Sequence, residues 1–184
     1  MVRLHPRPPH QTFATMIIDN MEAFTRLVVS MILSGLIGME REYHHKPAGL
    51  RTNVMVGLGA CLVTIASVRA FELVPGANVD PTRIAAQVIT GIGFIGAGAI
   101  LRPTNAKGGV VGLTTAATLW VVSGLGIAVG FGFYAEAIAT TVLVFFTFMF
   151  LSKIVSKMRE YTKVNPPKYE HDEDSFDSHE TREQ

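Results

Sequence analysis

The chain has 184 residues, of which 48% are hydrophobic and 17% are charged, and its formal net charge is +1. Soluble domains carry about 25% charged residues, so this composition favours a membrane protein. The near-neutral charge argues against a broad basic face for nucleic acid.

Five windows with almost no charged residues follow one another along the chain, and they predict membrane helices. A bilayer core about 30 Å thick needs about 20 apolar residues in a helix. The first window is short, but its helix can begin near Asp19 or Asn20, either of which can cap it. The expected spans are Met21–Met39, Asn53–Phe71, Ile84–Leu101, Leu113–Val129 and Phe133–Leu151.

The last two windows form a run of about 40 apolar residues, which as one helix would be twice the bilayer thickness. We therefore expect the chain to turn back at Gly130–Phe133, where two glycines stand. The predicted fold class is all-α, a polytopic bundle of five transmembrane helices.

Lysine and arginine counts predict the orientation of the bundle. If the loop 40–51 is cytoplasmic, eleven of the 16 basic residues lie inside and five outside. The N-terminus is then outside and the C-terminus is cytoplasmic. Residues 1–18, which contain no apolar signal region, are expected to be a disordered tail before a transmembrane domain over 19–152.

Residues 153–184 are expected to form a cytoplasmic, mostly disordered tail, since seven of the last fifteen residues are acidic. A docking segment for a partner is the alternative for this tail.

The stretch TGIGFIGAGA carries Gly91, Gly93 and Gly96 in the G-x-G-x-x-G spacing of a dinucleotide-binding turn. That motif needs a preceding strand and an acidic residue about 20 positions later, and residues 81–135 contain no Asp or Glu. We therefore expect no cofactor. The glycines instead suit a packing helix, on which a small-residue stripe consists of Ala86, Thr90, Gly93 and Ala97. Gly91, Gly96 and Gly98 widen this stripe. The partner of this stripe is another helix or a second subunit.

Three polar clusters remain as functional candidates. The first is the loop with Glu40, Arg41, Glu42, Lys46 and Arg51, which is either an ordinary solvated loop or an ordered, ion-paired one.

The second cluster is Asp80, Arg83 and Gln87 at the start of the third span. Asp80 can cap this helix, and Gln87 is expected to face the bundle interior or a wet cavity. Arg83 either snorkels to the surface or joins an outer vestibule, together with Glu22, Arg26, Arg69 and Glu72.

The third cluster holds Thr114 and Thr115, either of which can cap the fourth helix, and Trp120, which is expected to pack on a neighbouring helix. The chain shows no metal-binding motif, no nucleophile with a plausible base and no paired carboxylates within a span, so an enzyme is not expected. Cys61 is expected to be a buried hydrophobic residue.

Three motifs together resemble the MgtC/SapB family of bacterial inner-membrane proteins. They are GLIGMEREYHHKPAGLRTNVMVGLGA, DPTRIAAQVITGIGFIGAGAI and GLTTAATLWVVSGLGIAVGFG, in the family's order and spacing. The family pattern extends to Thr52 and to the polar residues of the three clusters.

The resemblance implies a multi-pass protein of the inner (plasma) membrane that supports adaptation to low magnesium, acid or intramacrophage stress, and hence virulence. It implies action by binding and modulating other membrane proteins, for example ATP synthase. Separately, the stripe from Ala86 to Ala97 predicts a homo-oligomer, with a dimer through the third helix favoured. The alternative is a small transporter or channel for Mg²⁺ or another cation that uses the Arg83/Gln87 vestibule. Longer family members carry a folded cytoplasmic C-terminal domain, where this chain has a short acidic tail.

Overall fold

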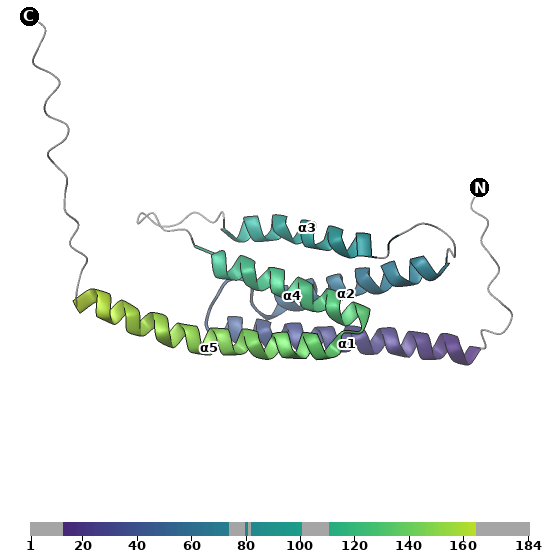
Figure 1. Cartoon of the computed structure of the whole chain (residues 1–184), viewed down its shortest axis with the longest axis horizontal. Coiled ribbons are helices and arrows are strands. Elements are labelled where there is room, and N and C mark those ends of the chain that lie inside the picture. Colours follow the sequence, from purple (N-terminus) through teal and green to yellow (C-terminus); the bar gives the residue numbers. More distant parts are fainter. Residues whose placement is uncertain (1–12, 74–79, 81, 101–110, 165–184) are drawn as a thin grey trace, which may run out of the picture. The chain divides into compact units, whose positions relative to one another are not determined.

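The computed structural model describes residues 13–73, 80, 82–100 and 111–164, and these residues form helices joined by short connections (Figure 1). The helices are α1 (Phe13–Tyr43), α2 (Leu50–Leu73), α3 (Thr82–Ile100), α4 (Leu113–Phe131) and α5 (Tyr134–Val164). All five are long and apolar enough to cross a membrane. The prediction of an all-helical protein with five membrane spans is confirmed.

The helices extend beyond several of the predicted spans. α1 begins at Phe13, inside the segment expected to be a tail, and it continues to Tyr43. α5 continues to Val164, well past the predicted end at Leu151. The apolar windows mark only the part of each helix that suits lipid, whereas backbone hydrogen bonds continue a helix into polar sequence.

The chain divides into two compact units, residues 1–145 and residues 146–184. The first unit holds α1 to α4 and the beginning of α5. In the second unit, the described residues continue α5 as a helix that carries a stacked pair of rings, Phe146 and Phe150, with centroids 5.0 Å apart.

Helices α2 and α4 pack closely because glycines on α4 leave room for the backbone of α2. A Cβ atom at Gly126 would overlap the carbonyl oxygen of Gly57 and lie 2.8 Å from the Cβ of Ala60. A Cβ atom at Gly130 would lie 2.6 Å from the Cβ of Thr64. Small residues spaced by four allow such close approach in membranes, where lipid offers apolar contacts equal to those of leucine.

Helices α1 and α2 also approach closely, and here serine hydroxyls bond across or along the helices. A Cβ atom at Gly57 would lie 2.6 Å from the Cβ of Ser34. Ser30 Oγ donates to the carbonyl of Gly57 (3.0 Å), and Ser34 Oγ donates to the carbonyl of Ser30 (2.5 Å). Both serines are buried, so each hydroxyl is satisfied by a backbone carbonyl within the bundle.

The predicted turn at Gly130–Phe133 is confirmed. Gly132 follows α4 with φ of 89°, the left-handed conformation that glycine adopts with little strain. The N–H groups of Gly132 and Phe133 donate to the carbonyls of Val129 (2.9 Å) and Ala128 (2.8 Å), which ends α4 before α5 begins.

The sequence had suggested that the small-residue stripe of α3 is the packing centre of the chain. In the structure of one chain it is not. Ala86, Thr90, Gly93 and Ala97 are all exposed, and the buried face of α3 carries Ala85, Ile92 and Gly96 instead. Among the glycines within helices, the tightest contact inside one chain is that of Gly126 on α4 with α2. Contact of the stripe with a second subunit stays a prediction.

Candidate functional site

The connection between α1 and α2 is an ordered hairpin that Glu42 holds together. Glu42 Oε2 accepts a hydrogen bond from the N–H of Leu50 (2.7 Å), the first residue of α2. The same carboxylate fills the space beside Gly49, where a Cβ atom would lie 3.1 Å from its Cδ. A carboxylate at a helix N-terminus accepts hydrogen bonds from free N–H groups and is stabilised by the positive end of the helix dipole.

The side chain of Asn53 also stabilises this hairpin through buried hydrogen bonds. Its side chain is fully buried, and Nδ2 donates to the carbonyls of Ala48 (2.6 Å) and Gly49 (2.8 Å). His45 and Ala48 adopt positive φ angles of 52° and 56°, which are uncommon for residues with a Cβ. The hairpin is therefore ordered by capping and by buried hydrogen bonds.

The other predicted polar residues of the hairpin lie at its surface or just beneath it. Glu40 Oε1 lies 3.1 Å from Nδ1 of His44, one turn later on α1. Arg41 is buried, whereas Lys46, Arg51 and Thr52 are exposed. Of the two alternatives left open for this loop, the structure has the ordered one, and its clearest acidic contact is the Glu42 cap of α2.

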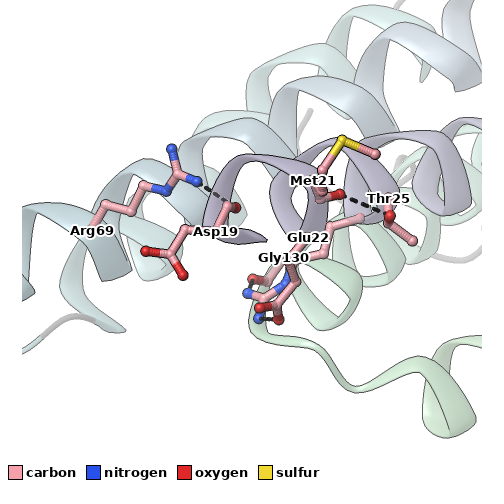
Figure 2. A network of polar contacts seen from close by, with 7 residues as sticks. Asp19, Met21, Glu22, Thr25, Arg69 and Gly130 are labelled. Carbon is pink, nitrogen blue, oxygen red and sulfur yellow. Dashed lines mark hydrogen bonds and ion pairs between the residues drawn. The ribbon is translucent and has the colours of Figure 1, made fainter. Parts of the chain in front are cut away.

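At the opposite end of the bundle, two arginines bind backbone carbonyls of neighbouring helices (Figure 2). Arg26 of α1 donates to the carbonyl of Gly130 on α4 (2.6 Å) and pairs with Glu22 one turn earlier. Arg69 of α2 donates to the carbonyl of Asp19 on α1 (2.8 Å). These contacts join α1 to the ends of α2 and α4.

The start of α3 is capped by Asp80, as predicted. Asp80 Oδ1 accepts from the N–H (2.8 Å) and the hydroxyl (2.7 Å) of Thr82. These hydrogen bonds lower the pKa of the Asp80 carboxyl below its usual value. The cap is therefore complete above the ordinary carboxyl pKa, and its contribution is lost as the pH falls through the lowered value.

Among the described side chains, those expected to form an outer vestibule do not come together in one chain. Arg83 and Gln87 are exposed on α3. Gln87 therefore does not face the interior of its own bundle, and the alternative expectation of a wet cavity stays a prediction. Arg26 and Arg69 are instead engaged by backbone carbonyls of α4 and α1. The side chain of Glu72 lies outside the described residues. The position of a residue along α3 predicts its depth in the membrane. The direction in which its side chain points depends on which helices pack against α3.

The beginning of α4 differs from the prediction, because neither threonine caps it. The cap residue is Gly112, with φ of 100° and no side-chain hydrogen bond to the helix. Thr114 is exposed and Thr115 is buried inside the first turn. Trp120 is 54% exposed, so it does not pack into this chain as expected.

Sequence reasoning missed several buried polar residues. Asn53 and Ser123 are fully buried, and Asn53 Oδ1 and Ser123 Oγ are buried without a hydrogen-bond partner in the described structure. The G-x-x-x-G spacing of Gly126 and Gly130 was a signal that could have identified the α4 contact face. Cys61 is buried and free, as expected.

The described residues contain no group of three or more His, Cys, Asp or Glu placed to hold a metal ion. The candidate site is therefore the polar and small-residue face of α3, together with the ordered hairpin. Both lie within residues 27–157, which match the model of the MgtC family.

The chain belongs to the MgtC family. Among MgtC-family relatives, SapB of Bacillus subtilis is 40% identical over 136 residues, which is 72% of this chain and 58% of SapB. YhiD of Escherichia coli K12, provisionally named a magnesium transporter, is 47% identical over 66% of this chain and 57% of YhiD. MgtC of Salmonella typhimurium LT2 is 42% identical over 64% of this chain and 47% of that protein.

The matched part of this chain spans about half the length of these curated MgtC-family relatives. No solved structure matches it significantly. The resemblance drawn from the three motifs is thus confirmed, and the protein is a multi-pass membrane protein of the MgtC type.

Proposed function

We propose that this MgtC-family protein is a non-enzymatic regulator of the bacterial inner membrane that binds and modulates other membrane proteins. Its role would be adaptation to low magnesium, acid or intramacrophage stress, with ATP synthase as one candidate target. We further propose that it self-associates, and that its N-terminus is outside and its C-terminus cytoplasmic, as the distribution of lysine and arginine favours.

The observation that carries this proposal is the chemistry of the exposed face of α3. Arg83, Gln87 and Thr90 are exposed along it, and Gly91 and Gly93 have open space where a Cβ atom would be. Polar side chains within a membrane span normally face protein or a wet cavity rather than lipid. Glycine surfaces permit close contact with another helix.

Helix α5 supplies the contrast. Its exposed side chains in the first unit include the large apolar Ile138, Val142 and Leu143, beside Ala135, Glu136 and Ala139 nearer its beginning. Such a surface packs well against lipid chains. Lipid chains form no hydrogen bonds with amides, and small residues bring no advantage in contact with them. The difference between the two helices favours α3 as the face that meets a protein.

A small cation transporter is the second candidate, and the provisional name of YhiD is the reason to retain it. The line from Arg83 through Gln87 to Thr90 descends along α3 from its first turn. Because these side chains face outward in one chain, a path along them would need a second protein surface opposite α3.

A photo-crosslinking residue placed at Gln87 should form adducts with protein in intact membranes, whereas the same residue at Ile138 should label mainly lipid. Mass spectrometry of the adducts identifies the contacting membrane protein. Absence of any protein adduct at Gln87 would refute a protein-binding face. Mg²⁺ uptake by proteoliposomes of the purified protein, abolished by Gln87→Leu, would instead support the transporter.

A further inference from the structure

We infer that the hairpin end of α2 is a binding site for an anionic phospholipid of the membrane. Arg51 and Lys46 bind the phosphate of its headgroup, and an acyl chain lies along the exposed residues Met55, Gly59 and Leu62. The inference goes beyond the proposed function and does not rest on it, because these residues belong to the hairpin and to α2.

One face of α2 is exposed from its first turn onward. Its members are Arg51, Met55, Gly59, Leu62 and Ala66, which recur at steps of four, four, three and four. Residues at such steps lie on the same face of a helix. The apolar members of this row lie within the membrane span of α2, so lipid or another protein covers them.

The side chains of the row favour lipid as the covering molecule. Met55 is 69% exposed and Leu62 is 55% exposed. Gly59, between them, has no atom within 4 Å of a Cβ position, so the surface is indented there. An acyl chain can follow such a surface in continuous contact. The row carries no polar side chain deeper than Arg51, and it therefore offers no hydrogen bond that would favour a protein partner within the span.

Arg51 stands where a lipid headgroup would lie. It belongs to the first turn of α2, one turn before Met55, and it is exposed. An arginine at the end of a span keeps its methylene groups on apolar surface and extends its charged group to the headgroup region. A guanidinium can donate two parallel hydrogen bonds to a phosphate, which matches the chemistry of a phospholipid.

The basic side chains at this end of the bundle leave charge for an anion. Lys46 and Arg51 are exposed, and none of the ion pairs in the described part of the chain includes either of them. The acidic residues of the hairpin have other contacts, because Glu42 caps α2 and Glu40 lies against His44. A negatively charged headgroup therefore complements this surface.

The neighbouring end of α1 marks the same level of the membrane. Tyr43, the last residue of α1, is 79% exposed, and Met39 one turn earlier is 56% exposed. Tyrosine is enriched at membrane–water interfaces, where its ring meets the headgroups. The hairpin between α1 and α2 is thus placed at headgroup depth.

Native mass spectrometry of the full-length protein in detergent tests the site by counting bound lipids. Phosphatidylglycerol should bind more tightly than phosphatidylcholine. Arg51→Gln and Lys46→Gln should each weaken phosphatidylglycerol binding about fivefold, the effect of one basic residue near an anionic surface. Both side chains are exposed, so the variants should fold normally.

Arg83→Gln is the matched control, because Arg83 is also exposed but lies at the start of α3, away from the hairpin. Its affinity for phosphatidylglycerol should equal that of the unsubstituted chain. Equal binding of the two lipids, or an equal loss of affinity in Arg83→Gln and Arg51→Gln, would overturn a site at the hairpin. Excess inorganic phosphate should not displace the lipid, and displacement would overturn the part assigned to the acyl chain.

A photo-crosslinking residue at Met55 locates the acyl chain in intact membranes. It should label phospholipid, and Arg51→Gln should lower the share of phosphatidylglycerol among the adducts. Protein adducts at Met55 would overturn the lipid site. These outcomes leave the proposed function standing, since that proposal is tested at Gln87 on another helix.

Discussion

Gly126→Ala is expected to lower the melting temperature of the detergent-solubilised protein by roughly 5–10 °C, since overpacking a close contact costs about 1–3 kcal/mol. The added methyl group would overlap the carbonyl oxygen of Gly57, which belongs to the backbone of α2 and cannot turn aside. Relief requires α2 and α4 to separate along their whole contact. Gly126→Leu should prevent the folded protein from accumulating.

Gly124→Ala is the matched control, because it lies on the same helix and has no atom within 4 Å of a Cβ position. Its melting temperature should be unchanged or slightly higher, since alanine is a better helix former than glycine by about 1 kcal/mol. Equal melting temperatures for the two variants would show that α2 and α4 do not pack through Gly126.

Gly112→Ala is expected to destabilise the protein by about 3 kcal/mol, for two reasons that add. Gly112 has φ of 100°, a conformation that strains any residue with a Cβ. The new Cβ would also overlap the carbonyl oxygen of Ala99, at the end of α3. The junction between α3 and α4 would have to open.

Size-exclusion chromatography after stepwise heating measures this effect as the fraction of monodisperse protein. Gly98→Ala serves as the control, because its Cβ would enter open space on α3. If Gly112→Ala survived heating as well as Gly98→Ala does, the left-handed cap at the start of α4 would be wrong.

The sequence was sufficient to predict the helices, because their signals are local. A charge-free window long enough for the bilayer predicts a span from length alone. The turn before α5 and the Asp80 cap of α3 were likewise predicted from adjacent residues, glycine at a turn and aspartate before a helix. These features depend on neighbours within one turn of the chain.

Contacts between helices were predicted less well, because small residues occur on several helices and the sequence does not say which of them meet. The stripe of α3 was the most regular, yet the close contact formed at Gly126 and Gly130 of α4. Glu42 caps α2 because the hairpin turns the chain back and brings its carboxylate close to Leu50, eight residues later. The turn needs His45 and Ala48 in the left-handed conformation, which these residue types do not predict.

The same reasoning explains why Gln87 was misplaced. Its depth in the membrane followed from its position along α3, but the direction it faces is fixed by Ala85, Ile92 and Gly96, which turn toward the bundle. Gln87 was expected to face the bundle interior or a wet cavity, and its exposure in the described structure contradicts only the first of these. Under the proposed function, a second protein surface lies opposite Gln87.

The most direct test of the protein-covered face of α3 is the oxygen accessibility of spin labels at Thr90 and Ile138, measured in lipid vesicles by power saturation. We predict low accessibility to oxygen and to polar relaxation reagents at Thr90, and high oxygen accessibility at Ile138, which is exposed on α5. A Thr90 label as accessible to oxygen as the Ile138 label would mean that lipid covers α3, and would contradict the account.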